Sequence, residues 1–158
     1  RDRGGDGTAI CTDVWFEDDT GRRVTTVLSG RPLRVALRYE LRRPSSRFEF
    51  RIGFYDRGGT CIAHNSTEYA PLPQASLPGS GVISCTVPRL PLPAGQYYVN
   101  TSIVRDGSIG ADRVERAAAF TVEPGDFYRS GKIPPASYGK TLFDYTWNLR
   151  AADRDIAA

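Results

Sequence analysis

Hydrophobic and polar residues alternate with a period of two in the first third of the chain, and this pattern limits the folds open to it. The two clearest runs cover residues 33–41 and 48–54, where every second side chain is apolar. Successive side chains of a strand point to opposite faces of a sheet, so each run has one apolar and one polar face. Antiparallel sheets that pack on one side only are typical of this pattern.

Glycine, proline and aspartate separate the apolar runs. The chain contains 16 Gly and 11 Pro, which is typical of many short strands joined by tight turns. We expect weaker strands over residues 8–16, 22–28, 60–65, 82–87, 97–104, 116–122 and 141–149. The sequence therefore predicts an all-β fold, an antiparallel two-sheet β-sandwich of the immunoglobulin-like or jelly-roll kind.

The length of 158 residues suits one domain. We place the sandwich at residues 8–149, with residues 1–7 as a flexible linker and residues 150–158 as a flexible tail. The sequence has no Met, so we expect it to be a piece of a longer protein. Two stretches rich in Pro, Gly and Ser, residues 66–81 and 123–140, are expected to be long loops.

The cysteines and the charge limit the compartment and the partners. Cys11, Cys61 and Cys85 form neither a CxxC motif nor an even disulfide framework, which favours a reducing compartment; one disulfide with one free thiol is the alternative. The net charge is only +3, with basic and acidic residues interleaved, so no nucleic-acid partner is expected. No apolar run approaches the roughly 20 residues of a membrane-spanning helix.

Residues suited to catalysis or metal binding are few. His64 is the single histidine, and no serine lies in a GxSxG motif, which argues against a Ser-His-Asp triad. The segment GDFYRSGK at 125–132 has five residues between its glycines and is followed by Ile133, so it fails as a phosphate-binding loop. We predict no catalytic residue, no metal and no cofactor.

Glu40 and Glu49 are the carboxylates best suited to glycoside hydrolysis, which needs two acids roughly 5 to 9.5 Å apart. We expect them on the polar faces of neighbouring strands, where acids that face arginines usually form cross-strand pairs. The acidic cluster Glu17-Asp18-Asp19 is expected at a hairpin turn. A glycosidase is therefore an alternative and not the favoured function.

Aromatic and polar side chains gather on the polar faces of the expected strands. Tyrosine rings can stack on the C–H faces of sugars, and Arg, Asn and Ser can hydrogen-bond sugar hydroxyls. Strand parity selects the candidate carbohydrate-binding residues Arg51, Tyr55, His64, Tyr98, Asn100 and Ser102. We predict a binding face rather than a catalytic site.

Several short motifs follow one another in a characteristic order. They include ICTDV at 10–14, GFYDRGGT at 53–60 and VPRLPLPAGQYY at 87–98, with Trp147 near the end. In this order the chain, over about residues 8–149, resembles the C-terminal domain of Wzt, the ATP-binding subunit of bacterial O-antigen polysaccharide ABC transporters.

The resemblance implies a cytoplasmic domain, peripheral to the inner membrane, that follows an ABC-type nucleotide-binding domain. It implies recognition of lipid-linked O-antigen or a related cell-surface glycan for export, a homodimer, and association with the nucleotide-binding and membrane subunits. The sugar contacts of this family vary with the polysaccharide, so the candidate residues rest on strand parity alone. Residues 88–95 are interpreted as a proline-stiffened crossover, after which Tyr97 points into the core like the tyrosine corner of other sandwiches.

Three other functions stay open at this point. The chain could be an accessory module or catalytic domain of a carbohydrate-active enzyme, or a structural or adhesion sandwich without a small ligand. It could also serve export of a different wall polymer such as a teichoic acid, whose phosphates would meet arginines on the polar face.

Overall fold

A computed structural model describes residues 3–43, 47–73 and 76–152. Within them the chain forms ten strands and one 3-10 helix at Ala136–Tyr138. The strands are β1 (Arg3–Gly4), β2 (Ala9–Glu17), β3 (Arg23–Val24), β4 (Thr26–Leu28), β5 (Leu33–Leu41), β6 (Phe48–Asp56), β7 (Cys61–Ser66), β8 (Ser80–Val87), β9 (Gly95–Arg105) and β10 (Ile109–Glu123). No helix in these three ranges is long and apolar enough to cross a membrane.

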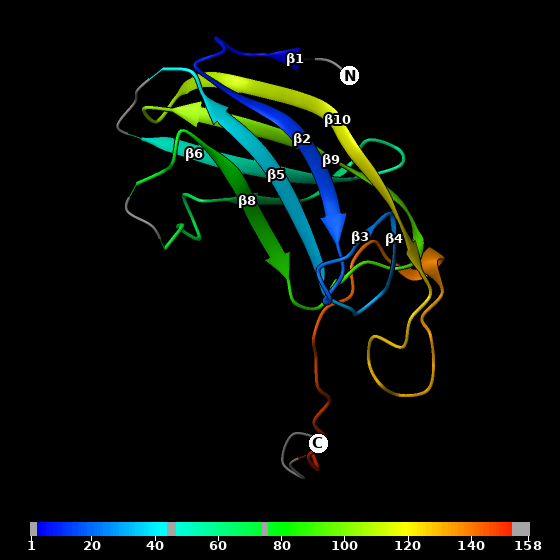
Figure 1. Cartoon of the computed structure of the whole chain (residues 1–158). Coiled ribbons are helices and arrows are strands. Elements are labelled where there is room, and N and C mark those ends of the chain that lie inside the picture. Colours follow the sequence, from blue (N-terminus) through cyan, green and yellow to red (C-terminus); the bar gives the residue numbers. More distant parts are fainter. Residues whose placement is uncertain (1–2, 44–46, 74–75, 153–158) are drawn as a thin grey trace.

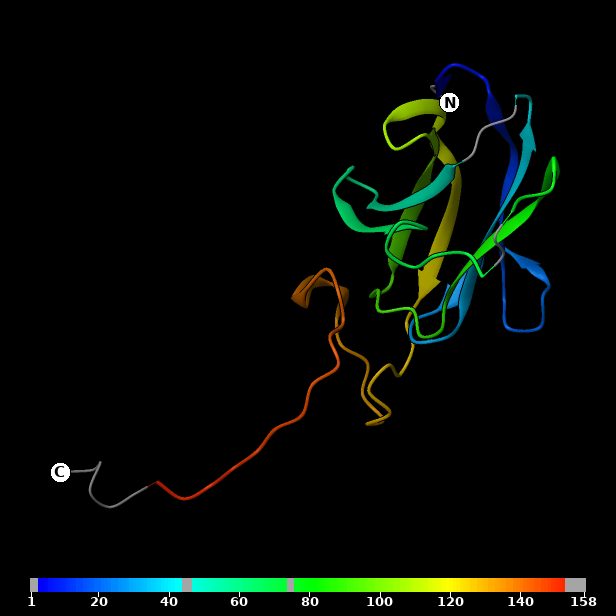
Figure 2. The same ribbon diagram turned by 90° about the vertical axis from the view of Figure 1, so that its left-hand side faces the viewer.

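The strands form two sheets that lie face to face (Figures 1 and 2). The larger sheet has the order β1-β10-β9-β6-β7, and the smaller sheet has the order β3-β2-β5-β8. All neighbours are antiparallel except β4, which pairs with β10 in parallel. The predicted all-β, two-sheet antiparallel sandwich is confirmed.

The apolar faces of the alternating runs make the core between the sheets. Leu33, Val35 and Leu37 of β5 are fully buried. Leu33 and Val35 pack in one core cluster with Ile52 and Phe54 of β6, and Leu37 packs in a second cluster with Phe50. Removal of these side chains from water is the main favourable contribution to folding. The period of two seen in the sequence therefore reflects the inward and outward positions of real strands.

The proline-rich motif carries the chain from one sheet to the other. β8 lies in the smaller sheet and β9 in the larger one. Just after this crossover the ring of Tyr97 is buried, and its hydroxyl donates a hydrogen bond of 2.7 Å to the carbonyl oxygen of Pro93. The expected tyrosine corner is confirmed in its geometry.

The N-terminal end of the described chain is tied to the large sheet. Arg3–Gly4 form β1 on the edge of β10, within the range 1–7 that we expected to be flexible. The guanidinium of Arg3 donates to both carboxylate oxygens of Asp112, at 3.0 and 2.6 Å, and the Asp112 side chain is only 3% exposed. Residues 1–2 of the predicted linker, and 153–158 of the predicted tail, lie outside the described residues.

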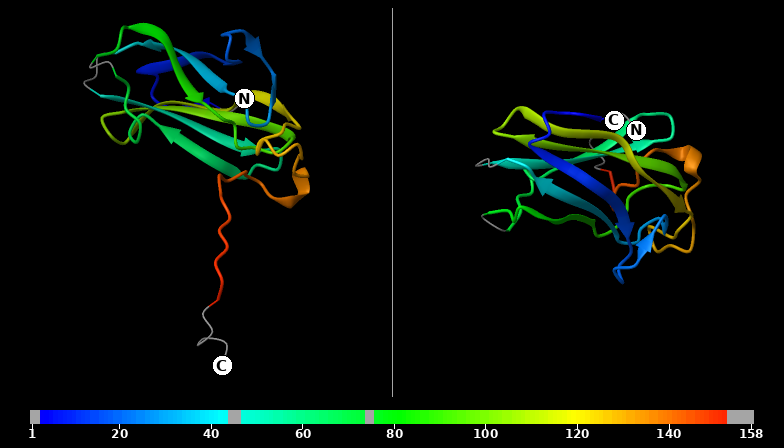
Figure 3. Two further views of the ribbon diagram at one scale, coloured as in Figure 1. Left: turned by 90° about the horizontal axis from the view of Figure 1, so that it is seen from below. Right: turned by 45° about the horizontal axis from the view of Figure 1, so that its top comes forward.

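After β10 the chain leaves the sandwich as an extended tail (Figure 3, left). The strand expected over residues 141–149 is wrong, because these residues pair with no neighbouring strand. The tail first passes along one end of the sandwich, where Phe127 is buried and the Leu142 N–H donates to the Pro91 carbonyl at 2.9 Å. Beyond that contact Trp147 is 91% exposed. The alternating pattern is present at 143–149, but a strand also needs a partner for its backbone groups.

Candidate functional site

The candidate residues selected by strand parity lie together on the outer face of the large sheet. β6 and β9 are paired so that Arg51 is opposite Ser102 and Tyr55 is opposite Tyr98. Gly53 lies between Asn100 of β9 and His64 of β7 in the same register. The intervening residues of β6 and β9 point inward and are buried, so the sheet brings the whole set to one surface.

Aromatic and cationic groups are stacked in a row across this surface. The rings of Tyr55 and Tyr98 are nearly parallel, at an interplanar angle of 8° with their centroids 5.3 Å apart. The guanidinium carbon of Arg116 lies 4.2 Å from the centroid of the Tyr98 ring. Because β9 lies between β6 and β10, Tyr55 and Arg116 flank Tyr98 on opposite sides.

This stack limits which parts of the two tyrosine rings a ligand can contact. We expected open ring faces for stacking against sugars, but both faces of Tyr98 are covered by neighbours. The ring of Tyr55 also leans over Gly53, where an added Cβ would lie 2.8 Å from its Cε2 atom. Hydroxyl groups and ring edges, rather than ring faces, are therefore the parts of this pair available to a ligand.

Arg116 is a site residue that the sequence analysis missed. The pairing of β10 with β9 shifts register between Val114 and Ala118, and Arg116 has a positive φ of 50° within this irregularity. Its backbone N–H donates to Asn100 Oδ1 at 2.8 Å, which orients the Asn100 amide. β-bulges commonly re-aim side chains near functional sites, but no residue type in the sequence marks this one.

The charge of Arg51 on this face is neutralised by Glu49. Nε and Nη2 of Arg51 donate to the two carboxylate oxygens of Glu49, and the Ser66 hydroxyl donates to the same carboxylate at 2.7 Å. The hydrogen bonds from Arg51, above all, lower the pKa of Glu49. Burial raises the pKa of the Tyr55 hydroxyl, so that group is a neutral donor and acceptor at physiological pH.

The expectation that Glu40 and Glu49 stand on neighbouring strands is wrong. Glu40 belongs to β5 of the small sheet, which pairs with β2 and β8, whereas Glu49 belongs to β6 of the large sheet. The two acids thus face outward from opposite sides of the sandwich. The carboxylate pair behind the glycosidase alternative does not exist in this fold, and Glu49 is held by Arg51 as an ion pair instead.

The cysteines and acids show neither a bridge nor a metal cluster. Cys11 is buried, Cys85 is half-buried and Cys61 is exposed, and all three are free thiols. The described part of the chain contains no group of three His, Cys, Asp or Glu residues that could hold a metal ion. Asp18 accepts hydrogen bonds from Thr20 and Arg22 in the turn before β3, as expected for a turn former.

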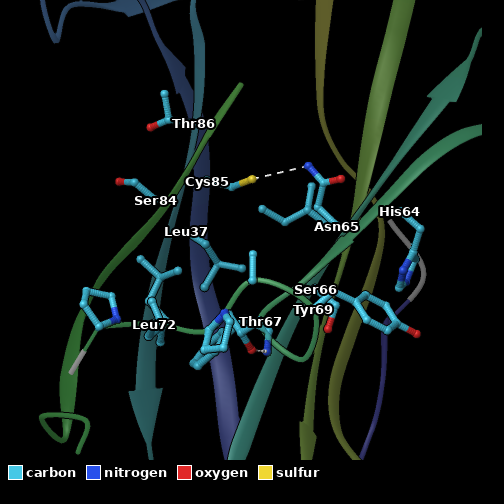
Figure 4. Close-up of a pocket in the computed structure, with 16 residues that line it drawn as sticks. Leu37, His64, Asn65, Ser66, Thr67, Tyr69, Leu72, Ser84, Cys85 and Thr86 are labelled. Atoms are coloured by element: carbon cyan, nitrogen blue, oxygen red, sulfur yellow. Dashed lines mark hydrogen bonds between the residues drawn. The ribbon is translucent and has the colours of Figure 1, made fainter. Parts of the chain in front are cut away.

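A cavity of about 500 Å³ opens beside the candidate face, between the edge strands β7 and β8 (Figure 4). Of the candidate residues only His64 lines it. Tyr69 lies next to His64 at the mouth, and Asn65 points across the gap toward Cys85. The sequence offered no signal for this cavity, because strand parity describes the two faces of a sheet and not the gap at its edge.

Comparisons with protein-family profiles and with solved structures both give matches. The sequence profile of a family described as "Wzt C-terminal domain" matches residues 1–133. One solved structure, described as "Crystal structure of the C-terminal domain of wzt", has a TM-score of 0.75 and 11% sequence identity, and the match covers 94% of this chain and 88% of that chain. No curated protein matches the chain. The structural likeness supports the fold, and the profile covers most of the sequence.

Proposed function

The chain belongs to the Wzt C-terminal domain family, and from this premise we propose that it is a non-catalytic polysaccharide-binding domain of an O-antigen ABC transporter. Its ligand in this proposal is lipid-linked O-antigen or a related cell-surface glycan that is recognised for export. The observation that carries the proposal is the gathering of Arg51, Tyr55, His64, Tyr98, Asn100 and Ser102 on one outer sheet face.

Hydrogen bonding to sugar hydroxyls is the recognition chemistry that this face supports. The hydroxyls of Tyr55, Tyr98 and Ser102 can both donate and accept, and the Asn100 amide is a further N–H donor. The stacked rings hold the tyrosine hydroxyls in fixed positions, so little side-chain freedom is lost when a glycan binds. A face of this kind binds a short glycan stretch in the millimolar to micromolar range, which corresponds to roughly 4 to 8 kcal/mol.

The partners and the location follow from the transporter proposal. An ABC-type ATPase domain would precede this domain in the full protein and would connect it to the membrane subunits. The domain would then lie in the cytoplasm, peripheral to the inner membrane. The three free thiols support a reducing compartment. The ion pair between Arg3 and Asp112 would hold the N-terminal segment, which follows the ATPase domain in this proposal, against the sandwich.

We also propose that the domain works as a homodimer. Phe143 and Trp147 are 75% and 91% exposed on the extended tail, and they alternate with polar residues as in a strand. Each of the two sheets ends in edge strands, and an unpaired edge can accept a strand from another chain. A second copy of this chain is therefore the proposed partner of the tail, and two linked sites would strengthen glycan binding without new contacts.

The glycan proposal is tested by removing hydroxyls while keeping the stacked rings. Tyr55→Phe and Tyr98→Phe are each expected to weaken binding of the host's own polysaccharide by about 3- to 10-fold, which is the usual net effect of one hydrogen bond. Calorimetric titration measures the affinity. Tyr138→Phe, on the exposed tail, is the control. Unchanged affinity in a variant that combines Tyr55→Phe and Tyr98→Phe would refute this face as the binding site.

The dimer proposal has a separate test. Trp147→Asp places a charge on the apolar side of the tail and should convert the dimer into a monomer in sedimentation experiments. Thr146→Asp places the same charge on the other side of the same segment and should leave the dimer intact. A monomeric parent chain, or equal effects of the two changes, would argue against the tail as the dimer contact.

A further inference from the structure

The cavity at the open edge of the sandwich differs in chemistry from the outer face. β7 and β8 are edge strands of different sheets and do not pair with each other. A single weak hydrogen bond, from Asn65 Nδ2 to Cys85 Sγ at 3.4 Å, joins them across the gap (Figure 4). Behind this bond the gap widens into the cavity of about 500 Å³, which the segment from Thr67 to Pro73 partly covers. Ligand sites of small molecules have this size.

The floor of the cavity is apolar and comes from both sheets. Leu37 and Ile83 belong to the small sheet, and Phe50 and Ile52 belong to the large sheet. A sugar hydroxyl pushed against this floor would lose its hydrogen bonds to water without gaining others, which is unfavourable. A methyl group placed there would instead be removed from water favourably.

The rim of the cavity is polar. Asn65 and Thr67 lie at the opening, whereas Ser84 and Thr86 of β8 point away from the gap (Figure 4). Asn65 is the better placed of the two, because it stands at the gap itself and its side-chain amide makes a weak hydrogen bond to the thiol of Cys85. A polar rim above an apolar floor fits a ligand that is polar on most sides and carries one apolar group.

The mouth of the cavity continues onto the candidate face. His64 lines the cavity, and it is also in register with Gly53 and Asn100 on the outer surface of the large sheet. Tyr69 is 77% exposed and lies beside His64 at the mouth (Figure 4). A chain of sugars can therefore pass from β9 and β6 across the edge strand β7 and reach the cavity without crossing the core.

We propose that this cavity binds a sugar residue that carries a methyl or acetyl group, such as a 6-deoxyhexose or an N-acetylhexosamine. The methyl group lies on the floor, and the remaining hydroxyls face the polar rim. The neighbouring sugars of the same glycan lie on the outer face. This inference rests on the proposed function and adds to it the class of sugar that the domain selects.

The test compares matched sugars on this chain. The probes are galactose against 6-deoxygalactose, mannose against 6-deoxymannose, and glucose against N-acetylglucosamine. Burial of one methyl group is expected to favour the second member of each pair by about fourfold. Saturation-transfer NMR should show the strongest contact at the methyl protons, and the side-chain amide signal of Asn65 should shift on titration.

A pair of variants places the effect in the cavity. Cys85→Phe adds a large ring at the inward-facing position on the gap and should abolish the preference for methyl-bearing sugars. Val82→Phe adds the same ring on the same strand, but at a position that is 48% exposed and does not line the cavity, so the preference should persist. If Cys85→Phe does not fold, the methyl contacts and the Asn65 shift in the unaltered chain decide the question.

The outcomes distinguish a failure of the cavity assignment from a failure of the proposed glycan-binding function. Equal affinity within each pair of sugars, or a preference that survives in Cys85→Phe, would overturn the cavity assignment while binding of the host polysaccharide still supported the proposed function. A change of oligomeric state in Cys85→Phe with unchanged sugar preference would show that a second copy covers the gap, which also overturns the assignment. Failure of every glycan to bind, the host polysaccharide included, would overturn both.

Discussion

The ring of Tyr55 stacks on the ring of Tyr98 across neighbouring strands, with an interplanar angle of 8° and centroids 5.3 Å apart. The two residues are directly opposite each other in the register of β6 and β9, so the sheet itself sets their spacing. Arg116 completes the row on the far side of Tyr98. Interactions of this kind order side chains before a ligand arrives, and a preordered surface loses less entropy on binding.

The stack should be measurable as a coupling energy. Tyr55→Ala and Tyr98→Ala should each lower the free energy of unfolding, and the double variant should cost less than the sum. The expected coupling is about 0.5 to 1.5 kcal/mol, which is typical of aromatic pairs. Urea unfolding of the parent protein, the two single variants and the double variant measures this coupling energy. Additive effects would show that the rings do not support each other in solution.

A second prediction concerns the crossover between the sheets. Tyr97→Phe removes the hydroxyl that donates to Pro93 and leaves the carbonyl without that partner. The expected loss of stability is about 1 kcal/mol, the net value of an ordinary hydrogen bond. Tyr138→Phe, at a side chain that is 84% exposed, should change stability very little. Equal melting temperatures for the two variants would contradict the role given to Tyr97.

The alternation of apolar and polar residues was enough to predict the β-sandwich. It also predicted which candidate residues share the outer face of the large sheet. The alternation at 33–41 and 48–54 fixes which side chains point inward, and Tyr97 after the proline-rich motif was correctly placed in the core. The same parity argument brought Tyr55, Tyr98 and Asn100 to one outer surface. These features depend on neighbours along a strand, and the sequence shows such neighbours directly.

The features that escaped prediction depend on contacts between distant segments. Glu40 was expected beside Glu49, because 33–41 and 48–54 follow each other in the chain, but the connection crosses from one sheet to the other. The position of Arg116 depends on a register shift in β10. The segment 141–149 has the alternation of a strand and lacks a partner. The alternation of apolar and polar residues predicts which side chains of a strand point inward or outward. It does not predict which other strand pairs with it.

The ion pair between Arg3 of β1 and Asp112 of β10 leads to a third prediction. The carboxylate of Asp112 is 3% exposed and accepts hydrogen bonds from the Arg3 guanidinium and from the Cys11 N–H. Arg3→Ala leaves this buried charge without its cation, which typically costs about 3 kcal/mol or more. Chemical denaturation followed by tryptophan fluorescence measures the loss.

An exposed ion pair on the same molecule provides the comparison. Arg31 and Asp19 are 3.1 Å apart with side chains 61% and 47% exposed, and such pairs contribute at most about 1 kcal/mol. Arg31→Ala should therefore cost far less than Arg3→Ala. Similar losses for the two variants would mean that β1 is not anchored by Asp112.

The last prediction concerns the three thiols, which the fold exposes to different degrees. Cys61 is exposed, Cys85 is half-buried and Cys11 is buried. Burial raises the pKa of Cys11 to about 11, so at pH 8 only about one molecule in a thousand carries the reactive thiolate at that position. Iodoacetamide should therefore label Cys61 first and Cys85 more slowly, and it should reach Cys11 only when the protein unfolds.

Peptide mass spectrometry at timed intervals distinguishes the three sites, and the same reaction in urea is the control, because all three cysteines should then react at similar rates. The raised pKa of Cys11 also has a consequence for stability. Between about pH 9 and 11 the thiol ionises in the unfolded chain before it ionises in the folded one, so its contribution to stability is present below pH 9 and is lost as the pH rises. Cys11→Ala should flatten this part of the stability profile. Labelling of Cys11 as fast as Cys61 in the native protein would mean that the core around β2 and β10 opens far more readily than its packing indicates.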